Sequence, residues 1–226
     1  MKKTLLIAVA WIGTLGLSAQ DILSNNPGEF SQLSLSGKMN VVLVEGDRNS
    51  FEVTLHQAEP DRFSWSVSDG KLNMRLRTNT QKESSADVKI TYTKLNLLEV
   101  SGASVRCENA LTGGIFSLTV NNGGNATVEV QAKDVTVQAD GNSAATLSGQ
   151  TLYLNIGANS KAKVDARVLE ARAATVSTQF GAEVFVWGTE KLDAKAGSSS
   201  VIYYKGTPEI FKQSSSLMGS VEQFSY

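Results

Sequence analysis

Apolar and polar residues alternate along the first half of the chain. Leu33 and Leu35, and then Met39, Val41 and Leu43, all occupy odd-numbered positions. Successive side chains of a β-strand point to opposite faces, so this period of two predicts strands with one face on a core and the other in water. No segment beyond residue 19 shows helical periodicity, and the pattern therefore predicts an all-β protein.

A turn signal separates two of the predicted strands. The segment 63–67 has its apolar residues on odd positions, and the segment 72–76 has them on even positions. Asp69-Gly70 lies between the two segments, and glycine adopts positive φ without steric cost. We therefore expect a β-hairpin at this place.

From residue 98 onward the chain repeats a unit in which a small residue is followed, two positions later, by Val or Leu. Successive units begin 17 to 23 residues apart, and they are Ala103-Val105, Ala126-Val128, Ala145-Leu147, Ala162-Val164, Ala182-Val184 and Ser199-Val201. The glycines expected at the corners are Gly102, Gly124, Gly141, Gly157, Gly181 and Gly197. A repeat of this length without helices predicts a short parallel β-helix (β-solenoid), whose stacked coils bury a shared core. An antiparallel sandwich of many short strands is the alternative.

The repeat also accounts for a stretch that is rich in small residues. The sequence "ADGNSAATLSG" at 139–149 contains a single large apolar residue. Inside a narrow coil, Ala145 and Ala162 fit where a corner crowds the axis, and Gly141 and Gly157 permit the chain to turn. We therefore predict that this stretch belongs to the stacked coils and is not a linker.

These patterns divide the chain into four parts. The predicted parts are a signal peptide at 1–19, an N-terminal β-strand region at 20–97, β-solenoid repeats at 98–221 with coils of about 17–23 residues, and a C-terminal end at 222–226. The signal peptide is expected from Lys2 and Lys3, the apolar run "LLIAVAWIGTLGL" and the small residues before Gln20. An uncleaved N-terminal anchor is the alternative, and we expect no transmembrane span in the mature chain.

Net charge narrows the range of partners. Loss of residues 1–19 removes two lysines and leaves 19 Lys and Arg residues against 22 Asp and Glu residues, a net charge of about −3. This charge argues against nucleic acid as a partner and gives no electrostatic reason to bind an anionic membrane. The expected location of the exported protein is the periplasm, the cell surface or the extracellular space.

The sequence offers little material for catalysis or metal binding. His56 is the only histidine and Cys107 the only cysteine, which excludes zinc and copper sites of the usual composition. We expect an outward-facing His56, a buried Cys107 thiol, and no cofactor, metal or catalytic residue. A carboxylate pair from Asp140, Asp165 and Asp193 is the arrangement left for a polysaccharide-modifying enzyme.

Two groups of residues are candidate ligand contacts. Trp187 and Tyr203 are aromatic residues whose rings can stack on a sugar. Asn125, Asn142 and Asn159 recur every seventeen residues beside the coil glycines. The three asparagines form either a ladder of side chains at the turns or a polar stripe that contacts a glycan.

Longer stretches of the chain are similar to a known family. The sequences "FSQLSLSGKMNVVLVEGDRNSFEVT", "DGKLNMRL" and "VKITYTKLNLLEVSGAS" are followed by coils rich in Gly, Asn, Ser and Ala. Over about residues 28–221 this pattern resembles the putative autotransporter adhesin, head GIN domain family. The resemblance implies a short β-helical fold and an exported adhesin of a Gram-negative bacterium.

Three functional interpretations remain open. The leading one is an exported, non-enzymatic protein that binds a glycan or another protein along an extended surface. The second is a periplasmic lipid- or oligosaccharide-binding protein, which a closed apolar pocket lined by Phe51, Phe63 and Trp65 would favour. The third is a polysaccharide-modifying enzyme, which an acidic and basic cluster on one coil face would favour.

The signal peptide gives the first testable prediction. Cleavage after Ala19 should make Gln20 the first residue of the mature protein. Mass spectrometry of the protein isolated from its native cells measures this directly, and retention of residues 1–19 would contradict export by this route.

Overall fold

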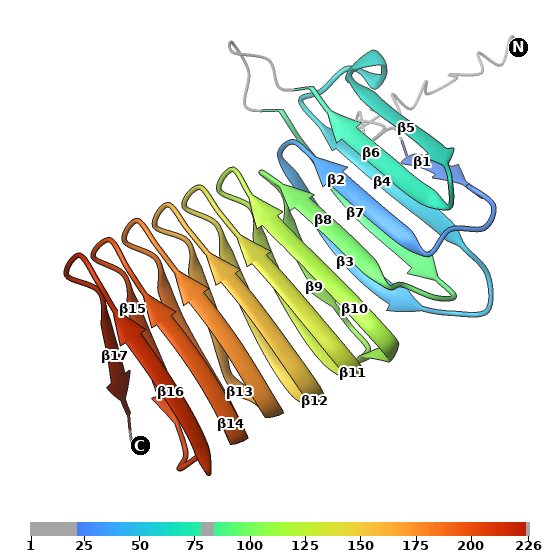
Figure 1. The fold of residues 1–226 in the computed structure, drawn as a ribbon. Helices are drawn as coiled ribbons and strands as arrows, with labels where there is room; N and C mark the ends of the chain where they lie inside the picture. Colours follow the sequence, from blue (N-terminus) through green and yellow to red (C-terminus); the bar gives the residue numbers. More distant parts are fainter. Residues whose placement is uncertain (1–21, 78–83, 225–226) are drawn as a thin grey trace, which may run out of the picture.

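Stacked β-strands make up almost the whole fold (Figure 1). The computed structural model describes residues 22–77 and 84–224, so the predicted signal peptide lies outside the described residues. The one helical segment within the described ranges is a short 3-10 turn, η1 Pro60–Arg62. The all-β prediction is confirmed, and so is the solenoid, which has about seven turns of about 19 residues each.

Seventeen strands form the stack, and they fall into a short-stranded and a long-stranded half. The first nine are β1 Ile22–Asn25, β2 Gln32–Ser36, β3 Met39–Glu45, β4 Ser50–His56, β5 Phe63–Ser68, β6 Lys71–Leu76, β7 Ser85–Tyr92, β8 Leu97–Ser101 and β9 Ser104–Cys107. The others are β10 Leu111–Asn121, β11 Asn125–Ala139, β12 Ala144–Ala158, β13 Lys163–Thr178, β14 Glu183–Ala196, β15 Val201–Lys205, β16 Ile210–Ser215 and β17 Ser220–Gln223.

Each coil contributes one strand segment to each of two sheets, which enclose one continuous core (Figure 1). Sheet 1 contains, in order, β5, β6, β2, β8, the second halves of β10 to β14, and β16. Sheet 2 contains β1, β4, β7, β3, β9, the first halves of β11 to β14, β15 and β17. Tight turns lead from sheet 1 to sheet 2, and wider bends within β11 to β14 lead back. We call the two sides of the stack the turn edge and the bend edge.

Strand register corrects the predicted alignment of the repeat units. The structure pairs Ala126 with Val105 and not with Ala103, and it pairs Ala145 with Val164. A shift of two residues keeps a side chain on the same face of its strand, so the predicted burial holds even where the register does not. In the last unit the shift is one residue, and Ile202 takes the fully buried position that was expected of Val201.

Six tight turns along the turn edge share one backbone conformation. Their two central residues have positive φ, as in a type I′ turn, and the pairs are Asn122-Gly123, Gly141-Asn142, Ser160-Lys161, Phe180-Gly181, Ser198-Ser199 and Leu217-Met218. Backbone hydrogen bonds also join neighbouring turns. The N–H of Lys161 donates to the carbonyl oxygen of Phe180 over 2.9 Å, and Ser199 donates to Leu217 over the same distance. Stacking therefore imposes the left-handed conformation whether or not the residue is glycine.

One expected corner is wrong. Gly157 lies inside β12, and Ser160 and Lys161, with φ of 53° and 63°, form the turn in its place. Neither serine nor lysine favours positive φ, so this turn carries no signal in the sequence.

Small residues are required where each tight turn re-enters the core. The position after the two left-handed residues is occupied in the six turns by Gly124, Ser143, Ala162, Ala182, Ser200 and Gly219. A Cβ atom on Gly219 would lie 2.5 Å from the carbonyl oxygen of Ala196, and one on Gly124 would lie 3.0 Å from that of Asn121. The small-residue stretch at 139–149 thus belongs to the stacked coils, as predicted.

The N-terminal strands cap the stack. The predicted hairpin joins β5 and β6, where Ser68 pairs with Lys71 and Asp69 and Gly70 both have positive φ. β6 and β7 pair in parallel with β2 and β3, so the parallel stack continues into residues before 98. The antiparallel strands β4 and β1 complete this end of sheet 2.

Aromatic residues fill the core at the capped end. Phe51 and Phe63 are buried, and Trp65 packs edge-on against Phe51 with ring centroids 5.1 Å apart. Phe51 and Phe63 are therefore core residues, whereas Trp65 is 37% exposed at the capped end.

The buried position of Ala145 gives a prediction about stability. Ala145 is 1% exposed, as expected, whereas its neighbour Ala144 faces outward and is half-buried. Ala145→Leu should overpack the coil and lower the free energy of unfolding by about 1–3 kcal/mol, and Ala144→Leu should have little effect. Thermal unfolding of the two variants tests this, and equal melting temperatures would contradict the inward placement.

Candidate binding groove

An open groove follows the bend edge, where β10 to β14 pass from sheet 2 to sheet 1. Its volume is about 540 Å³, and its lining residues are Gly113, Gln131, Ala132, Lys133, Gln150, Thr151, Leu152, Glu170, Arg172, Thr189 and Glu190. The hydroxyl of buried Thr151 donates a hydrogen bond of 3.1 Å to the carbonyl oxygen of Lys133 and so ties two neighbouring bends together. The groove therefore crosses the coils and runs along the axis of the stack.

One wall of the groove is a column with one side chain per coil. Gln131, Gln150 and Glu170 are paired by strand register, so they lie side by side. The same register continues the column to Thr112 at one end and to Trp187 and Lys205 at the other, and the full column is Thr112, Gln131, Gln150, Glu170, Trp187 and Lys205. We call it the wall column. Amide and carboxylate groups thus repeat at the strand spacing of about 4.8 Å.

The opposite wall carries charges of both signs. Lys133, Leu152 and Arg172 occupy equivalent positions on three successive coils, and Arg172 forms an ion pair of 2.7 Å with Glu190. Tyr153 follows Leu152 in the chain and is 53% exposed, so it offers an aromatic side chain next to this wall. This wall offers hydrogen-bonding groups and an aromatic face without a strong excess of either charge.

Two further depressions continue the groove toward the capped end. One has a volume of about 240 Å³ and includes Thr93, Lys94 and Thr112, which directly precedes Gly113 of the main groove. The other, of about 570 Å³, shares Thr93 and Lys94 with it and reaches Arg48. The three depressions therefore follow one another along the bend edge.

The structure brings the two candidate aromatic residues together. Trp187 belongs to the wall column, and the Lys205 ammonium lies 4.1 Å from the centre of its ring. Tyr203 lies beside it on the outer face of sheet 2 and stacks on Phe185 with ring centroids 4.8 Å apart. Arg167 covers the far face of this pair, 4.0 Å from the centre of the Phe185 ring. Both candidates are half-buried, and Trp187 is paired with Glu170 of the groove, whereas Tyr203 lies on the strand beyond it.

The three candidate asparagines lie elsewhere, along the turn edge. Asn125 begins β11, Asn142 is a central residue of a tight turn, and Asn159 is the first residue of the next turn. Register pairs Asn125 with Ala144, two positions beyond Asn142. A seventeen-residue spacing drifts by two residues per coil of about 19, so the three side chains form no ladder.

The three aspartates proposed for an enzyme face different directions. Asp140 lies at a tight turn, Asp165 points outward from sheet 2, and Asp193 belongs to the sheet-1 half of β14. Asp165 accepts a hydrogen bond of 2.8 Å from Nε of Arg167. The register does not bring these carboxylates together as a pair on one coil face.

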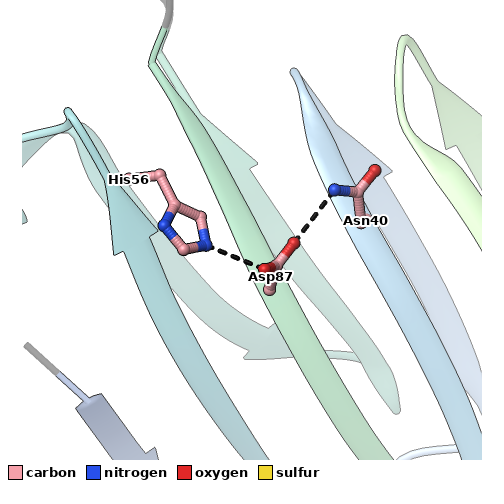
Figure 2. Close-up of polar contacts among 3 residues, drawn as sticks. All are labelled: Asn40, His56 and Asp87. Carbon is pink, nitrogen blue, oxygen red and sulfur yellow. Dashed lines mark hydrogen bonds and ion pairs between the residues drawn. The ribbon is translucent and has the colours of Figure 1, made fainter. Parts of the chain in front are cut away.

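A polar trio occupies the outer face of sheet 2 near the capped end (Figure 2). Nε2 of His56 on β4 lies 2.8 Å from Oδ2 of Asp87 on β7, and Nδ2 of Asn40 on β3 donates to Oδ1 of Asp87 over 2.9 Å. These hydrogen bonds, the one from Asn40 above all, hold the pKa of Asp87 below its usual value. His56 thus faces outward, as expected, whereas no local pattern in the sequence indicates Asp87 as its partner.

The remaining candidates for chemistry are few. Cys107 packs against the core, and burial raises the pKa of its thiol to about 12, so the thiol is protonated at neutral pH. Across residues 22–77 and 84–224, no three His, Cys, Asp or Glu side chains gather in a way that would hold a metal ion. Over the same ranges, no helix has the length and apolar character needed to cross a membrane.

Comparison with known proteins places the chain in a family. The family described as putative auto-transporter adhesin, head GIN domain, matches residues 29–208. The chain belongs to this family. Among curated proteins, no match is found.

Solved structures share the fold of this head GIN domain protein. A putative adhesin from Bacteroides fragilis has a TM-score of 0.80 at 20% identity, covering 92% of this chain and 98% of its own. A putative adhesin from Parabacteroides merdae has a TM-score of 0.73 at 15% identity, covering 93% and 98%. A putative lipid binding protein from Parabacteroides distasonis has a TM-score of 0.69 at 16% identity, also covering 93% and 98%. At these identities the likeness establishes the fold.

Sequence reasoning missed most of the groove in this head GIN domain protein. Gln131 and Gln150 are nineteen residues apart, and Glu170 follows after twenty more, so the wall column follows the period of the coil. That signal is visible only after the register is known. The expected coil length of about 17–23 residues admitted the seventeen-residue spacing of the asparagines, and the glutamines were not singled out.

The Asp87 trio gives a prediction about pH. Because the pKa of Asp87 is lowered in the folded protein, its ionised form stabilises the fold above the pKa of an unfolded aspartate, about 3.9, and this contribution is lost as the pH falls further. Asn40→Ala should raise the pKa of Asp87 toward the unfolded value, which a carboxyl NMR titration measures. His56→Ala should raise it as well. An unchanged titration in both variants would contradict the assigned hydrogen bonds.

Proposed function

We propose that this head GIN domain protein is an exported, non-enzymatic adhesin that binds an extended glycan along its bend edge. The wall column is the observation that carries the proposal, since it offers one hydrogen-bonding or aromatic side chain per coil over six coils. A spacing of about 4.8 Å is close to the length that one sugar residue adds to an extended chain, so successive sugars would meet equivalent groups.

The chemistry of the groove suits a glycan better than the other partners considered. Gln131 and Gln150 each offer amide donors and acceptors, and Glu170 offers acceptors, which match the hydroxyl groups of a sugar. Trp187 and Tyr153 are the aromatic residues for stacking on sugar rings. The groove is open and largely polar, so it offers a lipid tail no enclosed apolar site. This argues against lipid binding in the groove of this chain, although one structural neighbour is described as a putative lipid binding protein.

Tyr203 belongs to the proposed contact surface together with Trp187. The two residues lie on adjacent strands and lead from the groove onto the outer face of sheet 2. A glycan longer than the groove would extend over this face, where Tyr203 is stacked on Phe185 and already fixed in position. Such preorganisation lowers the entropy lost on binding.

Binding by the purified mature protein tests this function. A glycan array identifies a ligand, and calorimetry with that ligand compares variants. Gln131→Ala with Gln150→Ala should weaken binding at least about tenfold, and Trp187→Ala and Tyr203→Ala should each weaken it too, without lowering the melting temperature by more than a few degrees. Asn125→Ala, an exposed polar change on the turn edge, is the matched control and should bind as the wild type does.

Three results would contradict the proposal. One is an array without any bound glycan, and another is undiminished binding by the glutamine double variant. The third is turnover of a bound polysaccharide that Asp165→Asn abolishes, because that would make the protein an enzyme.

A further inference from the structure

Three large apolar side chains project from the turn edge, opposite the groove. Phe180, Leu217 and Met218 are 61%, 74% and 88% exposed. All three are central residues of tight turns, so they stand at the outermost points of their coils. Single exposed apolar residues are common on protein surfaces, but these occupy equivalent turn positions toward one end of a single edge.

The backbone makes these residues an unfavourable choice for stability. Phe180, Leu217 and Met218 have φ of 55°, 50° and 65°, a region that bulky side chains rarely occupy and that glycine and asparagine tolerate. The equivalent turn at Asn122-Gly123 shows the residues that suit this conformation. Bulky apolar residues here disfavour folding through backbone strain and recover little stability through burial, which points to a use outside the fold.

We propose that the turn edge docks on a lipid bilayer and inserts Phe180, Leu217 and Met218 into its surface. The turns form a convex row along the stack (Figure 1), and the residues of the intervening turn, Ser198 and Ser199, are small. Phe180 and Leu217 are two coils apart, about 10 Å. Separate projecting side chains on a convex row can enter a fluid lipid surface, whereas a protein partner would need a matching pocket for each of them.

The charge at the tips of the turns also suits a lipid bilayer. Among the central residues of the six tight turns between 121 and 219, only Lys161 is charged, and its charge is positive. The stem of Lys161 lies along Gly181, since a Cβ there would be 3.6 Å from Cγ of the lysine, and this places it next to Phe180. A lysine so placed keeps its stem on apolar surface and its ammonium at the level of the lipid phosphates.

Apolar insertion, and not net charge, supplies the attraction. The mature chain carries a net charge of about −3, so binding should not require anionic lipids and should persist at high salt. Docking by the turn edge leaves the bend edge facing away from the membrane. The inference does not depend on which ligand the groove holds.

Vesicle co-sedimentation of the mature protein tests this inference. The wild type should bind phosphatidylcholine vesicles, with and without phosphatidylglycerol, at low and high salt. The variant Phe180→Asn/Leu217→Asn/Met218→Gly converts two turns to residues that suit positive φ. Its partitioning into vesicles should fall at least about tenfold, while its melting temperature should stay the same or rise.

A control variant separates docking at this edge from general stickiness. Ile115→Thr/Val168→Thr removes two apolar side chains that are 65% and 54% exposed away from the turn edge, and it should bind vesicles as the wild type does. Failure of the wild type to bind either kind of vesicle, or equal binding by the triple variant, would overturn the inference. Self-association of the wild type that the triple variant abolishes, without vesicle binding, would assign the edge to a second copy and overturn it as well.

Discussion

Hydrogen bonding from coil to coil is the interaction on which the rest of the structure depends. It runs through both sheets and does not stop at the turn edge, where Gly123 donates to Gly141 and Gly181 donates to Ser198 over 2.9 and 3.0 Å. In the six turns from Asn122 to Met218, each turn therefore repeats the conformation of its neighbour, and two consecutive residues are left-handed. These hydrogen bonds also bring the chain back into the narrow interior after each turn. The position after the two left-handed residues is therefore glycine, alanine or serine.

This constraint leaves outward-facing positions free and gives the two edges different characters. A side chain that points outward from a bend meets only its equivalents on the coils above and below, so a column such as Gln131, Gln150 and Glu170 becomes a continuous wall. At the turn edge the central residues point away from the stack and form separate projections. One edge is thus hollowed and polar, and the other is convex and, toward Leu217 and Met218, apolar.

The sequence predicts which residues of a strand face the core, but it does not predict which residues of neighbouring strands are paired. Alternation is a local property, so the inward placement of Leu33, Val41 and Ala145 follows from the pattern alone. Register depends on coil length, and coils of slightly different length let a seventeen-residue match imitate the true period of about 19. The groove, the turn at Ser160-Lys161 and the contact between His56 and Asp87 all depend on register or on long-range pairing. They were therefore outside the reach of local reasoning.

Departures from local preference have two separate causes in this fold. At Ser160 and Lys161 the left-handed backbone follows from stacking, and the polar side chains lose nothing by facing water. At Phe180, Leu217 and Met218 the same backbone is forced on large apolar residues that make no core contact to compensate. Stacking explains why a residue in this position is left-handed, but it does not explain why the residue is apolar. The second property needs a contact outside the chain, and this separation identifies the turn edge as an interaction surface distinct from the groove.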